Sequence, residues 1–162
     1  MLLQFDERML KSLRQRRDEQ LAGVHAGRLP AVEDLLVADE VIWVRSGFGN
    51  ASFLGLDGRA IFWNYGDGYG PEVLTDLQGV ACVVAWAAEG GLSELLEVLP
   101  KMPSNAKTCR QCNGSRWMRK KKRTVQDQSG GPQVCHLCHG LGWTVTEQSV
   151  GHGAADDADS TG

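Results

Sequence analysis

Apolar and charged positions alternate over the first 27 residues with the period of an α-helix. The apolar positions are Leu2, Phe5, Met9, Leu13, Leu21 and Val24. This spacing predicts one amphipathic helix over residues 2–27 whose apolar side covers a core. Pro30 is expected to end it, because proline has no N–H and clashes with the preceding helical turn. Val32, Leu35 and Leu36 predict a further short helical turn.

From Glu40 the pattern changes to that of β-strands. Residues 41–44 are β-branched or aromatic, and residues 51–56 and 59–64 form two short apolar runs. Asp57 and Gly58 lie between these runs and predict a hairpin with a type I′ turn, in which both central residues have positive φ. Residues 72–74 predict a third strand.

Helical signals return after residue 74. Residues 75–78 fit a capping box, with Thr75 at the start and Gln78 three positions later. The helix that follows is apolar on nearly all sides and is expected to be buried, with Cys82 as a small core hydrophobe. Gly90 and Gly91 are expected to end it. Residues 92–99 predict one more short helix.

These elements predict an α+β chain in three parts. A small domain of helices and antiparallel sheet covers residues 1–103, a finger covers 104–146, and a tail covers 147–162. Charge supports the division, because the net charge is −6 over residues 1–103, +7 over 104–145 and −4 over 146–162. The tail has few apolar residues and is expected to be disordered.

The strongest chemical signal is a pair of C-x-x-C motifs. Four of the five cysteines form them: Cys109, Cys112, Cys135 and Cys138. Two thiolates from each tight turn complete the tetrahedral sulfur set that Zn²⁺ prefers, and a closed set of this kind is structural. We therefore expect one structural zinc ion. An iron–sulfur centre or a redox dithiol fits the spacing less well.

The segment between the motifs is expected to bring them together. Residues 117–134 predict a β-hairpin with its tip at 126–131, which returns the second motif to the first. The motifs are separated by 22 residues, slightly more than usual for such zinc sites, and a longer hairpin accommodates this. His136 and His139 flank the second motif and are expected to remain outside the ligand set.

The second motif, Cys135 to Gly142, has the C-x-x-C-x-G-x-G form and resembles the cysteine-rich zinc finger of DnaJ-type chaperones. The first motif has this form except that Arg116 stands in place of the last glycine. The resemblance implies zinc ligation by the four cysteines and a protein-binding surface. It covers a half-size finger with two such motifs, enough for one zinc. The chain has no His-Pro-Asp tripeptide, so the resemblance does not extend to a J-domain.

Residues 1–103 resemble the SUKH superfamily of small α+β domains. The resemblance rests on residues 53–59, on residues 61–66 and on the predicted helix after Asp76. SUKH domains are known chiefly as bacterial toxin-immunity proteins and as scaffolds in fungal cell-wall signalling. Membership would imply a protein partner. Leu29-Pro30 is the nearest fragment to the Leu-Pro entry of the family.

Basic and aromatic residues of the finger form a candidate recognition surface. They are Arg116, Trp117, Arg119, Lys120, Lys121, Lys122, Arg123 and Trp143. Such a surface suits a nucleic acid, whose phosphates attract cations and whose bases stack on tryptophan. The alternative is a solvated hairpin whose lysines keep an exposed edge soluble.

The pattern as a whole predicts a non-enzymatic, zinc-binding interaction protein. No catalytic triad, paired carboxylates or open metal site can be argued from the residues. No secretory signal is visible and no apolar run is long enough to span a bilayer, which predicts a cytoplasmic protein without membrane contact. The leading function is binding of a protein partner, as an immunity-type or scaffold protein. The alternative is a nucleic-acid-binding regulator.

Overall fold

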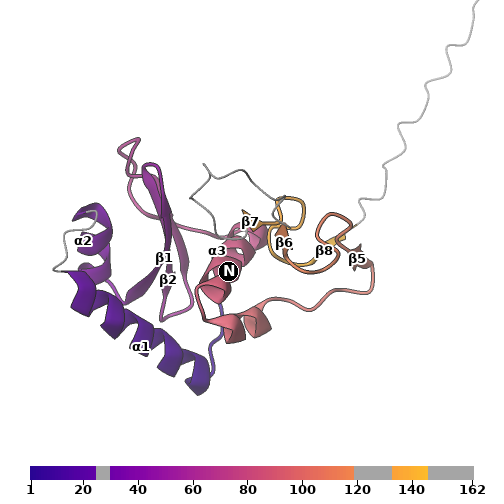
Figure 1. Ribbon diagram of the computed structural model, residues 1–162, viewed down its shortest axis with the longest axis horizontal. Helices are drawn as coiled ribbons and strands as arrows, with labels where there is room; N and C mark the ends of the chain where they lie inside the picture. Colours follow the sequence, from indigo (N-terminus) through magenta and orange to yellow (C-terminus); the bar gives the residue numbers. More distant parts are fainter. Residues whose placement is uncertain (25–29, 119–132, 146–162) are drawn as a thin grey trace, which may run out of the picture.

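The computed structural model describes residues 1–24, 30–118 and 133–145 (Figure 1). Along the chain the elements are α1 (Glu7–Gly23), α2 (Pro30–Ala38), β1 (Val41–Gly47), β2 (Asn50–Gly55), β3 (Ala60–Trp63), β4 (Glu72–Val73), α3 (Leu77–Glu89), the 3-10 helix η2 (Ser93–Val98), β5 (Ala106–Thr108), β6 (Trp117–Met118), β7 (Gln133–Val134) and β8 (Trp143–Val145). This mixture of helices and small antiparallel sheets confirms the predicted α+β class.

Strands β1 to β4 form one antiparallel sheet in sequence order. Apolar residues occupy both faces of its central strands, so each face needs a cover. Val41, Phe53 and Ile61 belong to a buried cluster that also contains Val32 and Leu36 of α2. The alternate residues, among them Ile42, Leu54 and Ala60, pack in a second cluster with α3. The sheet therefore lies between α2 and α3, and α1 contributes to both clusters.

The first helix is shorter than predicted. It begins at Glu7 because the Asp6 carboxylate caps it, accepting the N–H of Met9 at 2.8 Å. The residues before it are extended, and the N–H of Leu3 donates to the carbonyl of Gly58 at 2.9 Å. Pro30 begins α2, a position that proline tolerates because the first helical N–H needs no partner. The predicted helical turn is thus a helix of nine residues.

The β2–β3 hairpin forms with a different turn from the one predicted. Only Gly58 has a positive φ, 89°, whereas a type I′ turn requires it at Asp57 as well. The N–H of Gly58 donates to the carbonyl of Gly55 at 3.0 Å, and the N–H of Gly55 donates to the carbonyl of Arg59 at 2.7 Å. This is a three-residue loop with a glycine bulge. Asp57 instead accepts hydrogen bonds from Arg59, from its backbone N–H at 3.2 Å and from its side chain.

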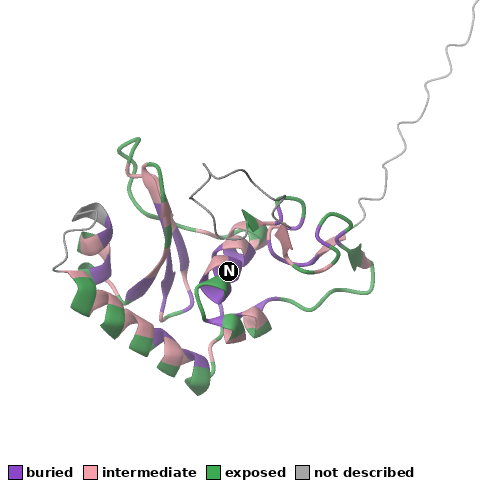
Figure 2. Cartoon of the chain, in the orientation of Figure 1, coloured by how far each residue is buried: buried purple, intermediate pink, exposed green. Residues whose placement is uncertain are grey.

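Helix α3 is the centre of the molecule. Its N-cap is Asp76 and not Thr75, because the Asp76 carboxylate accepts the N–H of Gly79 at 2.6 Å, so the predicted capping box was placed one residue early. Seven of its thirteen residues are buried, as its apolar sequence predicts (Figure 2). It ends at Glu89, before Gly90 and Gly91, and the next predicted helix is the 3-10 helix η2.

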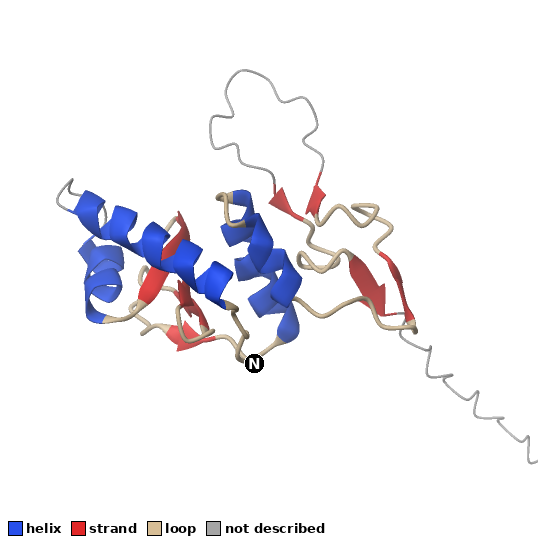
Figure 3. Cartoon of the chain, turned by 90° about the horizontal axis from the view of Figure 1, so that it is seen from below, coloured by secondary structure: helices blue, strands red, loops and turns tan. Residues whose placement is uncertain are grey.

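The sheet lies on one side of α3 and the two short strand pairs lie on the other (Figure 3). These pairs are β5 with β8 and β6 with β7, both antiparallel. The C-x-x-C motifs lie between these strands, one between β5 and β6 and the other between β7 and β8. Helix α3 therefore lies between the sheet and the cysteine-bearing segment. Among the described residues, no helix is long and apolar enough to cross a membrane.

Candidate metal centre

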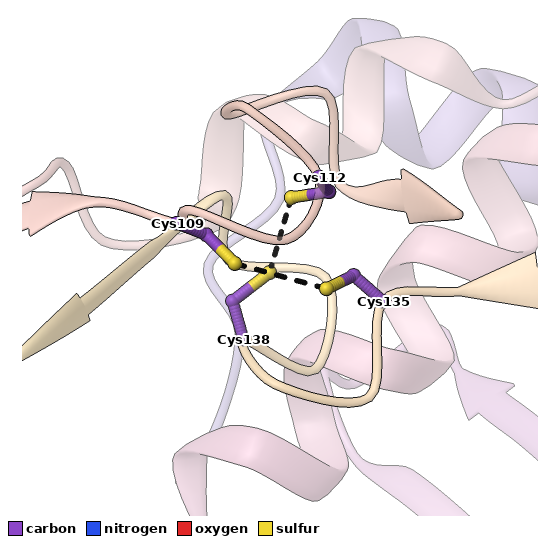
Figure 4. Close-up of side chains that lie close together, drawn as sticks. All are labelled: Cys109, Cys112, Cys135 and Cys138. Atoms are coloured by element: carbon purple, nitrogen blue, oxygen red, sulfur yellow. Dashed lines mark hydrogen bonds between the residues drawn. The ribbon is translucent and has the colours of Figure 1, made fainter. Parts of the chain in front are cut away.

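The two C-x-x-C motifs converge on one point (Figure 4). Cys109, Cys112, Cys135 and Cys138 are all buried, and their sulfur atoms lie within 4.8 Å of one another. The Sγ–Sγ distance is 3.7 Å both between Cys109 and Cys135 and between Cys112 and Cys138. A tetrahedron with metal–sulfur bonds of about 2.3 Å has edges of about 3.8 Å. Two of the six sulfur–sulfur distances match this edge and the others are at most 4.8 Å, so the four sulfurs can hold a metal ion.

Each motif lies in a tight turn, which we call a knuckle: the first knuckle is Cys109–Arg116 and the second is Cys135–Gly142. The two knuckles have the same backbone conformation. Three equivalent positions have positive φ in both: Asn113 (53°) and His139 (50°), Gly114 (78°) and Gly140 (88°), and Arg116 (72°) and Gly142 (81°). The N–H of Ser115 bonds to the carbonyl of Cys112, as that of Leu141 does to Cys138. The knuckles are therefore structural repeats.

The strands join the knuckles crosswise. The strand after the first knuckle, β6, pairs with β7, which leads into the second knuckle. The strand after the second, β8, pairs with β5, which leads into the first. The N–H of Cys109 donates to the carbonyl of Gly142, and the N–H of Cys135 donates to that of Arg116, both at 2.9 Å. Backbone pairing thus brings all four cysteines together.

Backbone N–H groups point at the sulfur atoms. Burial is the largest influence on Cys109 and would raise its pKa, but the N–H groups of Cys112 and Gln111 and the neighbouring thiols lower the pKa to about 7. Burial raises the pKa of Cys138 to about 12, although the N–H groups of Gly142 and Gly140 partly oppose it. The N–H of Gly142 lies 3.3 Å from the Cys138 sulfur. Such N–H groups stabilise the thiolates that a cation would bind.

The side chain of Arg116 links the two knuckles. Its Nη1 donates to the carbonyl oxygens of Gly140 at 2.7 Å and Leu141 at 3.0 Å. Arg116 takes the left-handed conformation of the glycine that it replaces, so the first knuckle keeps its shape without that glycine. The sequence nominated Arg116 for partner recognition. In the structure its guanidinium is half-buried and holds the second knuckle.

The second knuckle packs directly on α3. A Cβ added to Gly140 would lie 2.8 Å from the Cβ of Ala85 and 3.1 Å from the carbonyl oxygen of Ala81. The four cysteines and Leu141 belong to the same buried cluster as α3 and β2. A finger of this size has few apolar residues to form a core of its own. In the structure, the finger packs its buried residues into the same cluster as α3, and Gly140 lies directly against that helix.

The other predicted recognition residues divide into two groups. Trp117 and Trp143 are half-buried, and Trp143 packs against the main cluster. Arg119, Lys120, Lys121, Lys122 and Arg123 lie outside the described residues, as do the predicted hairpin tip and the acidic tail. The described base of the hairpin is the β6–β7 pair. Nucleic-acid binding by the basic run therefore stays a prediction.

Two polar side chains beside the sulfurs connect the knuckles further. His136 is exposed, and its Nε2 lies 3.0 Å from the Nε2 of Gln111, whose Oε1 lies 3.9 Å from the Cys135 sulfur. Among the described residues, the grouped candidate metal ligands are the four cysteines without a histidine. Sequence reasoning missed Gln111 and strand β5, because a single glutamine and a three-residue strand carry no pattern of their own.

The fifth cysteine lies apart from the centre. Cys82 is on α3, and burial raises its pKa to about 11, partly opposed by the positive charge of Arg45. A thiol with so high a pKa is almost wholly protonated at neutral pH and is a poor nucleophile. This agrees with the expected role of a small apolar residue.

Comparison with models of known protein families, with curated proteins and with solved structures finds no match. Neither the DnaJ-type resemblance of the finger nor the SUKH resemblance of residues 1–103 is shown by these comparisons. The geometry alone establishes a buried cluster of four cysteines that can hold a metal ion.

Proposed function

We propose that this chain is a non-enzymatic interaction protein stabilised by one structural Zn²⁺ ion and that it binds a protein partner. The observation that carries the proposal is the set of four buried sulfurs, which lie within 4.8 Å of one another and include two pairs at 3.7 Å. Four thiolates fill the coordination sphere of zinc and leave no position for water or substrate, so the ion serves the fold. The two knuckles correspond to half of a DnaJ-type finger.

The consequence for the molecule is that the metal fixes the finger on α3. The knuckles share the buried cluster of α3, and the second knuckle contacts Ala81 and Ala85. Metal binding to such a site contributes directly to folding free energy, about 10–16 kcal/mol in zinc-finger peptides. The SUKH resemblance supports a partner of protein nature and an immunity-type or scaffold role. Under this proposal the zinc maintains the surface that the partner contacts.

Metal analysis of the purified full-length chain tests the first half of the proposal. We expect one zinc per chain, no iron, and loss of the metal with loss of the folded finger on chelation. A chain with all four cysteines intact but with no bound metal, or with bound iron, would overturn the zinc assignment. Cys82→Ser is the matched control, because Cys82 lies outside the cluster and its loss should leave the metal content unchanged.

Crosslinking of the tagged chain in its native cells tests the second half. We expect one partner protein to be enriched in a zinc-dependent manner, and the purified partner to bind the purified chain directly. The enrichment should disappear for Cys112→Ser and persist for Cys82→Ser. Recovery of nucleic acid in place of protein would favour the alternative function that the basic run suggests.

A further inference from the structure

An open groove lies between the start of α3 and the finger. Its volume is about 770 Å³, within the range of ligand-binding sites, and its sides come from α3, β5, β8 and the second knuckle. The apolar residues that line it are Leu77, Leu137, Leu141, Trp143 and Val145. Leu137 is 38% exposed and Val145 is 49% exposed, so two large apolar side chains that line the groove are open to solvent.

The groove carries positive charge where β5 leads into the first knuckle. Lys107 and Arg110 line it, both are exposed, and neither forms an ion pair among the residues that the structure describes. Within the described part of the chain, no carboxylate lines the groove. Asp76, next to Leu77, is the nearest acid along the chain, and its carboxylate accepts the N–H of Gly79 at the start of α3. An occupant with negative charge would therefore meet two unpaired cations.

We propose that this groove binds an extended peptide segment of a partner protein, in which apolar side chains stand next to carboxylates. This inference rests on the proposed function and names the chemistry of its partner. The apolar side chains would cover Leu137, Trp143 and Val145, and the carboxylates would pair with Lys107 and Arg110. Apolar residues outnumber cations in the lining, which favours a peptide over a nucleic acid, since nucleic-acid sites are much more positively charged.

The groove depends on the metal centre. Lys107 and Arg110 stand on either side of Cys109, whereas Leu137 and Leu141 flank Cys138, and Cys138 itself lines the groove. Its two sides therefore face each other only while the knuckles are held together. Peptide binding should be lost when the zinc is removed, even though no peptide atom contacts the metal.

Selection from a displayed random peptide library tests the proposal. The bait is the full-length, zinc-loaded chain. Enriched peptides are then synthesised with a fluorescent label, and their affinities are measured by anisotropy for the parent chain and two charge reversals. The groove variant is Lys107→Glu with Arg110→Glu. The matched control is Lys11→Glu with Arg14→Glu, which reverses two exposed cations on α1, away from the groove.

We expect enriched peptides with acidic and apolar residues, whose affinity falls at least about tenfold for the groove variant and stays within about twofold for the control. Leu137→Ser should weaken binding without altering the charge. Peptides that bind the groove variant as tightly as the parent would overturn the groove assignment while leaving the proposed function standing. If no peptide is enriched but single-stranded DNA binds and is lost in the groove variant, the peptide proposal is wrong.

A further measurement shows whether a variant loses affinity because it misfolds or because it lacks a contact with the peptide. Each variant is assayed for zinc content and thermal unfolding beside the parent. The proposal requires that the groove variant keep one zinc and a parental unfolding temperature while losing peptide affinity. If affinity falls only together with zinc content, the cations act through the fold and the assignment fails.

Discussion

The two knuckles have the same backbone conformation around the four sulfurs but differ in what they pack against. Both use the same positive-φ positions, the same internal hydrogen bond and the same crosswise pairing into the other knuckle. Their surroundings differ: Gly140 of the second knuckle packs against α3, whereas a Cβ added to the equivalent Gly114 would meet the Thr108 side chain at 3.2 Å and the Gly142 carbonyl oxygen at 3.8 Å. The shared features bring the four sulfurs together, whereas the packing around each knuckle differs.

The second difference concerns the last position of each knuckle. Gly142 has no room for a side chain, since an added Cβ would lie 2.9 Å from the carbonyl oxygen of Gly114. Arg116, its equivalent, holds a left-handed φ of 72° and uses its side chain to bind carbonyls of the other knuckle. Packing thus restricts position 142 to glycine. At position 116, two side-chain hydrogen bonds offset the strain of a left-handed backbone.

Removal of one cysteine from either knuckle should have the largest effect. Cys112→Ser and Cys138→Ser occupy equivalent places, so each should lower the zinc affinity by several orders of magnitude and unfold the finger. Zinc titration and near-ultraviolet circular dichroism of the two variants would measure this. If one variant keeps parental zinc affinity, the knuckles do not contribute equally to a single metal ion.

Alanine at the equivalent glycines Gly114 and Gly140 should separate the effect of the shared backbone conformation from that of packing on α3. Gly114→Ala should cost about 1–2 kcal/mol, because alanine is strained at positive φ. Gly140→Ala should cost about 2–4 kcal/mol, because the added methyl group also collides with Ala85. Urea unfolding of the zinc-loaded variants gives both values. Gly70→Ala is the control, since its added Cβ meets nothing within 4 Å; equal costs at Gly114 and Gly140 would refute the packing difference.

Two substitutions of Arg116 should separate the cost of its backbone strain from the gain of its two hydrogen bonds. Arg116→Ala loses both bonds and keeps the strain, so it should destabilise by about 1–2 kcal/mol. Arg116→Gly loses the bonds but relieves the strain, so it should be more stable than the alanine variant by about 1 kcal/mol. Urea midpoints and the rate of zinc transfer to a chelator would order the variants. If the Arg116→Ala variant is at least as stable as the Arg116→Gly variant, this explanation is wrong.

Sequence and structure agree where spacing decides the outcome. The C-x-x-C pairs and their separation predict one four-cysteine centre, and the β-branched and apolar runs at residues 41–44, 51–56 and 59–64 predict the central strands. Strand β5 escaped prediction because Ala106–Thr108 has no pattern, and it is a strand only because the returning β8 pairs with it. The role of Arg116 as a link between the knuckles also escaped prediction. Its side chain bonds to carbonyls that are 24 and 25 residues away along the chain.

The helix boundaries show the same limit of local reasoning. Apolar spacing extended the first helix to residue 2, but the Asp6 cap starts it at Glu7, and Leu3 instead bonds to the β2–β3 loop. The contact between Gly140 and α3 joins residues more than 50 positions apart. The sequence shows a glycine there, but its partner becomes known only in the folded chain.

The smallest effect should be the alkylation of Cys82, the thiol that lies outside both knuckles. Burial raises the pKa of Cys82 to about 11, so its thiolate is scarce at pH 8. Iodoacetamide should therefore modify Cys82 of the zinc-loaded chain at least about tenfold more slowly than free cysteine. The rate should rise about tenfold per pH unit until the pH approaches 11, because only the deprotonated form reacts. Mass spectrometry of the modified peptide measures it, and a rate independent of pH would contradict the raised pKa.

X-ray absorption at the zinc edge of the full-length protein tests the central claim most directly. Because the two knuckles contribute equally, we predict a single shell of four sulfur atoms at about 2.3 Å from one zinc. A spectrum that requires nitrogen or oxygen ligands in place of a sulfur, or a zinc content other than one per chain, would contradict the closed four-cysteine centre.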